Sequence, residues 1–337
     1  MDLNILWFIL IAVLFVGFFF LEGFDYGVGM LLPFLGKNDA ERRVIINSIG
    51  PVWDGNEVWM ITAGGASFAA FPHFYATLFS GAYLALTLML LALIARAVSF
   101  EYRSKVESPT WRSRWDWVIF ISSLLPALLW GVATAALLYG TPIDAHMNFT
   151  GGFFSLLSAY SISAGLLFIV IFCFYGATFL ALKTAGELSQ RAEDTAKRLW
   201  PAGLVLFLID AALELTTTDV LAHTGAIVVV LLAVAAVTYI LARVFLSKGR
   251  QGWTFVMSAL TIVFAVITLF VGLFPRLMVS SLDPNWSLTI YNASASHYTL
   301  KAMSIVVVIF LPFVLVYQAW TYWIFRKRLT TESKVEY

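Results

Sequence analysis

Long apolar segments recur along the whole 337-residue chain. A helix needs about 20 apolar residues to cross about 30 Å of hydrocarbon at about 1.5 Å per residue. Hydrophobic residues make up 61% of the chain and charged residues 12%, which leaves too little polar surface to cover a soluble domain. The sequence therefore predicts an all-α integral membrane protein with about nine transmembrane helices, at residues 5–35, 49–71, 74–98, 118–139, 153–182, 199–213, 225–246, 253–274 and 303–325.

Basic residues are concentrated in alternate connections between these segments. Of the 21 Lys and Arg residues, all but Arg276 and Lys301 fall in the connections on one side or in the C-terminal tail. Because basic loops stay in the cytoplasm, we expect the N-terminus outside and the C-terminus in the cytoplasm. No repeat, low-complexity tract or flexible linker divides the chain, so residues 1–337 are expected to form a single polytopic membrane domain.

Charge, cysteine and histidine content exclude several functions. The net charge of +1 gives no basic field for nucleic acid, and Cys173, the only cysteine, cannot form an intramolecular disulfide. A membrane haem is normally ligated by His, Met or Cys on helices inside the bundle. The four histidines, however, all fall in turns or loops on the outer side: His73, His146, His223 and His297. We therefore predict that this chain ligates neither a haem nor a metal ion.

Two of the apolar segments carry pairs of acids. Glu22 and Asp25 stand three residues apart in LEGFDYGVG, and Asp54 and Glu57 repeat that spacing in PVWDGNEVW. Residues three apart share one face of a helix. A charged residue inside a bilayer costs about 2.5 to 3.5 kcal/mol at a helix centre, so such acids are candidates for function. Both pairs are expected toward the cytoplasmic side.

Three interpretations of these acids are open from the residues alone. In the structural one, Asp54 complements a helix dipole, while Glu22 and Asp25 pair with Arg42, Arg43 or a neighbouring helix. In the second, the carboxylates line a water-filled cleft and hand protons inward from the cytoplasm. In the third, the chain is a secondary transporter that uses Asp25 and Asp54 as ion sites. The sixth segment also contains an acid, Asp210, and Glu214 follows it directly; the two acids shorten its apolar core.

Several dispersed motifs resemble one protein family. They cover residues 22–30 (EGFDYGVGM), 42–65 (RRVIINSIGPVWDGNEVWMITAGG), 100–105 (FEYRSK), 111–117 (WRSRWDW) and 287–296 (SLTIYNASAS). Together they resemble subunit II of the cytochrome bd quinol oxidases. The WDGNEVW block is specific by itself.

This resemblance implies an enzyme complex in a prokaryotic cell membrane. The complex oxidises quinol, reduces dioxygen to water and generates proton motive force without pumping protons. Two haems b and one haem d are held by the larger subunit I. Subunit II is expected to consist of two four-helix bundles plus a peripheral helix, and to stabilise subunit I in a heterodimer. Some members carry a quinone in subunit II, and a small single-helix accessory subunit can join the complex.

The resemblance also implies roles for individual residues. Trp53 and Asp54 are similar to family residues along a cytoplasmic proton route, and Asp25 lies in a second acidic block. Glu57 is the fourth candidate for this route, although Gln replaces it in some members. No catalytic or cofactor-binding residue is expected in this chain itself.

Overall fold

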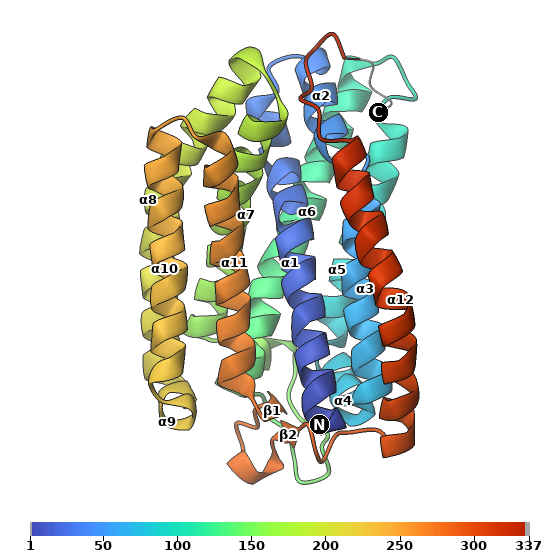
Figure 1. Cartoon of the computed structure of the whole chain (residues 1–337), viewed down its shortest axis with the longest axis vertical. Coiled ribbons are helices and arrows are strands. Elements are labelled where there is room, and N and C mark those ends of the chain that lie inside the picture. The colour runs from blue at the N-terminus through green and yellow to red at the C-terminus, as the bar shows by residue number, and fades with distance from the viewer. Residues whose placement is uncertain (1, 334–337) are drawn as a thin grey trace.

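The computed structural model describes residues 2–333, and this part of the chain is mainly helical (Figure 1). The helices are α1 (Leu3–Leu35), α2 (Asp39–Ile49), α3 (Trp53–Ala70), α4 (Pro72–Gly81), α5 (Tyr83–Tyr102), α6 (Pro109–Tyr139), α7 (Ala159–Lys183), α8 (Gly186–Thr217), α9 (Val220–Thr224), α10 (Ala226–Ser247), α11 (Gln251–Leu273) and α12 (His297–Ile324). Two short 3-10 turns, η1 (Phe153–Leu156) and η2 (Pro284–Trp286), and two strands, β1 (Arg276–Met278) and β2 (Leu288–Thr289), complete the fold.

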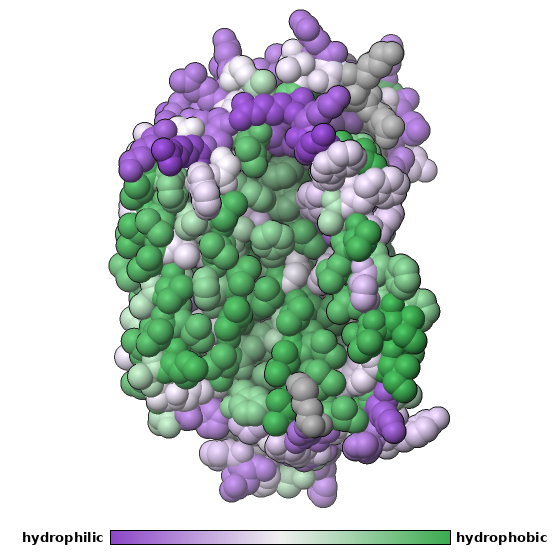
Figure 2. All heavy atoms as spheres, viewed as in Figure 1, coloured by the Kyte–Doolittle hydropathy of each residue, from purple (hydrophilic) through white to green (hydrophobic). Residues whose placement is uncertain are grey.

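Eight of the described helices are long and apolar enough to cross a membrane: α1, α5, α6, α7, α8, α10, α11 and α12. On the face shown in Figure 2, apolar residues form a broad band across the middle of the molecule, with hydrophilic residues at both ends. The predicted all-α membrane protein is therefore confirmed. Helix α3 runs beside these spans but is less apolar. The count of nine spans and the division into two four-helix bundles stay predictions.

The two ends of the chain lie at opposite ends of the molecule. The N-terminus lies beside the two strands, and the C-terminal segment lies beside α2 (Figure 1). An odd number of crossings would produce this arrangement. The assignment of the α2 end to the cytoplasm rests on the distribution of basic residues and stays a prediction; the two ends are called cytoplasmic and outer below in that sense.

Several helix boundaries differ from those that the apolar pattern predicted. The segment 49–71 begins as a helix only at Trp53, after a turn at Gly50 and Pro51. The segment 74–98 is divided into α4 and α5 at Ala82, where the Phe149 ring packs directly against Gly81.

The fifth and sixth segments also differ from the prediction. Residues 153–156 form a 3-10 turn, and α7 starts only at Ala159, after a capping box made by Ser158 and Ser161. The sixth segment, 199–213, is part of a 32-residue helix because α8 extends through polar residues at its cytoplasmic end. Hydropathy marks the part of a helix that lies in lipid and misses its polar extensions.

Glycine pairs bring α7 close to two neighbouring helices. Gly176 of α7 faces Gly27 of α1, and Gly165 of α7 faces Gly131 of α6. A Cβ atom on Gly131 would lie 2.6 Å from the Cα atom of Gly165. Small residues let membrane helices approach until their backbones touch, which increases the van der Waals contact between them. These crossings fix α7 against α1, the helix that carries the first acidic pair.

The connection before α12 folds over the outer end of the bundle. Strands β1 and β2 pair antiparallel there, with Arg276 opposite Thr289. The Arg276 guanidinium holds Asp219, at the start of α9, through two bonds of 2.5 and 2.9 Å. This bidentate ion pair holds the connection between α8 and α10 against the segment that precedes α12.

The Asp219–Arg276 pair predicts a pH-dependent contribution to stability. The hydrogen bond from Arg276 lowers the pKa of Asp219 below its usual value of 3.8. A lowered carboxyl pKa means that the pair stabilises the fold above about pH 4 and is lost as the pH falls through the folded-state pKa. We expect Asp219→Asn to cost about 1 kcal/mol or less at pH 7, because the carboxylate is half exposed. Melting curves of wild type and variant should converge as the pH is lowered toward 3; a constant difference would contradict this role.

Candidate functional site

The first acidic pair is fully buried toward the cytoplasmic half of α1. Glu22 and Asp25 both have no exposed surface; Glu22 bonds a side chain of α5 and Asp25 one of α3. Their three-residue spacing thus places them on one face, as predicted from the sequence. Buried carboxylates require compensating charges or hydrogen bonds, so their partners define the site.

Arg96 of α5 provides the compensating charge. Its Nη1 atom lies 2.5 Å from Oε1 of Glu22 and 3.2 Å from Oε1 of Glu57 on α3. The guanidinium also lies over the rings of Tyr26 and Phe100, at 5.0 and 5.5 Å from their centroids. One fully buried cation therefore joins α1, α3 and α5.

Asp25 is held by an amide rather than by a cation. Asn56 of α3 donates from Nδ2 to Oδ2 of Asp25 at 2.6 Å. The carbonyl oxygen of the Asn56 side chain accepts bonds from Gln318 and Tyr322 of α12, at 3.0 and 2.9 Å. A line of polar side chains therefore runs from α1 through α3 to α12, the helix at the edge of the molecule (Figure 1).

We call Glu22, Asp25, Asn56, Glu57 and Arg96 the carboxylate cluster. Several of its buried polar atoms have no hydrogen-bond partner among the described residues: Oε2 of Glu22, Oδ1 of Asp25, and Nε and Nη2 of Arg96. Buried polar groups in native proteins are nearly always paired with protein or with ordered water. The cluster therefore has the free acceptors and donors that bound water, or a transferred proton, would use.

Comparisons with known proteins place this arrangement in a family. Residues 3–325 match the family described as "Cytochrome bd terminal oxidase subunit II". "Cytochrome bd ubiquinol oxidase subunit 2" of Bacillus subtilis (strain 168) is 46% identical and covers 100% of this chain and 99% of its own length. The chain belongs to the cytochrome bd oxidase subunit II family. The resemblance seen in the sequence motifs is thereby confirmed, and the chain is part of a quinol oxidase complex.

Other relatives agree with this membership. "Cytochrome bd-I ubiquinol oxidase subunit 2" of Escherichia coli (strain K12) is 41% identical over 98% of this chain and 96% of its own. The structure of bd oxidase from Geobacillus thermodenitrificans contains a chain that aligns with a TM-score of 0.78, 17% identity, and coverage of 97% of this chain and 100% of that one. At that identity the match shows the fold alone.

The second acidic pair of this subunit II is divided between surface and interior. Glu57 joins the carboxylate cluster through Arg96, and its side chain retains 14% exposure. Asp54, one turn earlier on α3, is exposed and contacts no member of the cluster by an ion pair. Trp53 is buried, with its ring 5.1 Å from that of Phe100. Of the four residues predicted for a proton route, Asp25 and Glu57 thus lie in the cluster, Trp53 packs beside it, and Asp54 lies on the surface.

The structural interpretation offered Arg42, Arg43 or a neighbouring helix as the partner of Glu22 and Asp25, and the partners that the structure shows lie on neighbouring helices. Arg42 pairs with Asp116 of α6 at 2.8 Å rather than with Glu22 or Asp25. Asp116 and Arg103 are also fully buried and lie 2.6 Å apart. Because α2 leads away from α1 at the cytoplasmic end, Arg42 cannot reach the carboxylate cluster. Arg42, Arg103 and Asp116 form a separate charge layer that fixes α2, α5 and α6 together.

Sequence analysis missed two members of the cluster, Arg96 and Asn56, and the two α12 side chains that bond Asn56, Gln318 and Tyr322. Arg96 was counted with the basic residues of the cytoplasmic connections, although it precedes the end of α5 and is fully buried. An arginine at the end of an apolar segment requires a counter-charge, which is the signal that could have identified it. Asn56 and Gln318 gave no such signal, because single amides are common in membrane helices that pack on one another.

The described histidines do not fit a haem held inside the bundle. All four are exposed and lie at the outer end: His73 in the first turn of α4, His146 in a loop, His223 in α9 and His297 at the start of α12. We therefore derive no step of the reaction through a haem bound to this chain.

Proposed function

We propose that this subunit II stabilises a haem-bearing subunit I and carries part of its cytoplasmic proton supply. In the proposed complex, subunit I holds haems b and d, which supply the electron transfer from quinol to dioxygen. The reaction generates proton motive force without a pump, because quinol releases protons outside and water formation takes them from the cytoplasm. A bound quinone in this chain and a single-helix accessory subunit are further proposals from the family resemblance. The transporter hypothesis has no support from the relatives and is not retained.

The observation that carries the proton proposal is the buried carboxylate cluster with free acceptor atoms. Oε2 of Glu22 and Oδ1 of Asp25 have no partner among the described residues, and each can hold a proton. Glu57 links them to the surface, since it contacts Arg96 on one side and retains some exposure on the other. Acids inside a membrane bundle that face a polar interior are typical of proton relays.

Helix α3 supports the proposed contact with subunit I. Val58, Ile61 and Phe68 are exposed on it, and a Cβ atom at Gly64 or Gly65 would meet nothing within 4 Å. The exposed Asp54 lies on the same helix. A carboxylate on a less apolar membrane helix is better accommodated against a protein partner than against lipid. We infer that subunit I covers α3 and that Asp54 passes protons toward it at that interface.

Neutralising Asp54 tests this role. We expect Asp54→Asn to lower quinol-driven oxygen consumption by the purified complex by about a hundredfold or more, the lower end of the range for a positioned proton-transfer group. Haem content should stay close to that of wild type, because Asp54 makes no ion pair with any residue between positions 2 and 333. The readout is oxygen consumption per haem.

Glu107→Gln is the matched control for Asp54→Asn. Glu107 is also an exposed acid at the cytoplasmic end, between α5 and α6, but it lies outside the cluster and off α3. The control should retain both turnover and haem. Wild-type turnover per haem in Asp54→Asn would reject the proton role and leave the structural one.

A further inference from the structure

Another acidic pair, with one member buried and one partly exposed, lies at the opposite end of the molecule from the carboxylate cluster. Asp210 and Glu214 are one turn apart on α8, and Glu214 is three residues from the end of that helix at Thr217. Glu214 is only 6% exposed. At about 1.5 Å per residue, its Cα atom lies about 5 Å from the outer end of α8.

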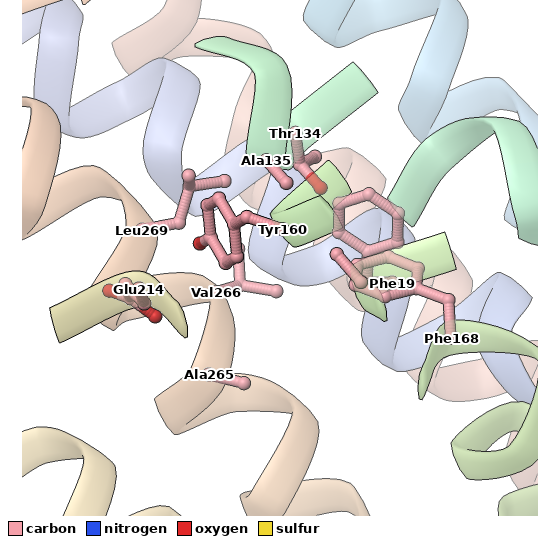
Figure 3. A pocket seen from close by; sticks show the side chains of 10 residues that line it. Phe19, Thr134, Ala135, Tyr160, Phe168, Glu214, Ala265, Val266 and Leu269 are labelled. Carbon is pink, nitrogen blue, oxygen red and sulfur yellow. The ribbon is translucent and has the colours of Figure 1, made fainter. Parts of the chain in front are cut away.

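Glu214 lines a cavity between five helices. The cavity has a volume of about 60 Å³, enough to hold at least one water molecule. Tyr160 of α7 and Thr134 of α6 contribute hydroxyls to its wall, while α1 and α11 contribute apolar side chains. The Tyr160 hydroxyl faces the Glu214 carboxylate (Figure 3). The cavity is therefore polar on the α7–α8 side and apolar on the other.

No described side chain neutralises this pair. Neither acid takes part in any ion pair among residues 2–333. Helix α11 has no charged residue, α7 has only Lys183 at its cytoplasmic end, and α10 has only Arg243 near its cytoplasmic end. At the outer end, Asp219 is bound by Arg276, and His223 contacts the backbone oxygen of Phe274.

Free acceptor atoms point to what the cavity binds. Oε1 of Glu214, which lines the cavity, and Oδ1 of Asp210, one turn earlier on α8, have no hydrogen-bond partner among the described residues. Two ionised carboxylates one turn apart repel each other, and burial without a counter-ion raises the cost further. A small cation supplied from solution would resolve both problems.

We propose that Asp210 and Glu214, with Tyr160, form a proton-binding site that is loaded from the outer side. One proton is held between the two carboxyls together with water in the cavity. Asp210, Glu214 and Tyr160 offer at most five side-chain oxygens from two helices, fewer than the six or more oxygen ligands that Ca²⁺ takes. A proton needs only one carboxyl and one hydrogen-bond acceptor.

Infrared spectroscopy of the intact oxidase complex at neutral pH tests the site. We expect wild type to show the C=O stretch of a protonated carboxylic acid that shifts in D₂O, and Glu214→Gln to lose the intensity of one such group. Tyr160→Phe should keep that intensity and move its frequency, because it removes a hydrogen bond. If Glu214→Gln does not assemble, the site can still be tested by the frequency change in Tyr160→Phe and by the D₂O shift of wild type.

Glu107→Gln is the control here too and should leave the band unchanged. A band identical in wild type and Glu214→Gln would overturn the proposal. A second result would also overturn it: replacing choline by Na⁺ raises the melting temperature of wild type but not that of Glu214→Gln. That result would assign the cavity to a metal cation with both acids ionised. Activity is not the readout, so the outcome is independent of the proton route proposed for Asp54.

Discussion

Replacing Arg96 with methionine should abolish assembly of the oxidase complex. Arg96 is fully buried and is the only described cation bound to Glu22 and Glu57. Methionine fills a similar volume but leaves these carboxylates in the bundle without a counter-charge. Breaking a buried ion pair by removing one partner costs about 3 to 5 kcal/mol. That loss is comparable to the lower end of the stability of a whole protein, about 5 to 15 kcal/mol. We expect little or no haem-containing complex in membranes.

Two further variants separate lost charge from lost packing. Arg96→Lys keeps the charge but loses the planar fork that reaches two carboxylates and the contact with the Tyr26 ring, so its yield should be intermediate. Combining Arg96→Met with Glu22→Gln removes both members of the closest pair and should recover part of the yield. Arg250→Met, at an exposed arginine before α11, is the matched control and should assemble normally. Normal haem content in Arg96→Met would show that the cluster does not need its cation.

The helices of this fold could be predicted because lipid imposes one requirement on every span. A backbone in hydrocarbon must satisfy its own hydrogen bonds, so each apolar segment becomes a helix. Helix ends follow other rules. The end of α4 at Gly81 depends on the Phe149 ring, which is distant in sequence, and the start of α7 depends on the Ser158 cap. The hydropathy pattern of the sequence carries no information about either contact.

Of the carboxylate cluster, the sequence could predict how the two acids on α1 lie relative to each other, but not their partners. The spacing of Glu22 and Asp25 was enough to place both on one face of α1. Their partners come from residues 31 to 74 positions away, since Asn56 bonds Asp25 and Arg96 bonds Glu22. Such pairings depend on which helices pack together. That order is determined by small-residue crossings and by the connections, neither of which the acids themselves encode.

Replacing Gly27 with alanine should be as damaging as losing Arg96, although it changes no charge. A methyl group on Gly27 would overlap the carbonyl of Phe172 and lie 2.9 Å from the backbone nitrogen of Gly176. These atoms are backbone, so no side-chain rotation can make room, and α1 and α7 must separate. Overpacking costs about 1 to 3 kcal/mol where side chains can yield, and more where they cannot. We expect a strong loss of assembled complex, measured as haem per milligram of membrane protein.

Gly252→Ala is the matched control, because it makes the same chemical change at a position where no other helix packs against the glycine. Gly252 lies in the first turn of α11, and a Cβ atom there meets nothing within 4 Å. Alanine is favoured over glycine in a helix by about 1 kcal/mol, so this variant should assemble at least as well as wild type. Gly176→Ala, on the facing helix, should reproduce the defect of Gly27→Ala, because the two glycines share one contact. Gly27 lies two residues after Asp25, so separation of α1 from α7 would also displace the acids of the cluster. A normal yield of complex in Gly27→Ala would mean that this helix crossing does not hold the acids in place.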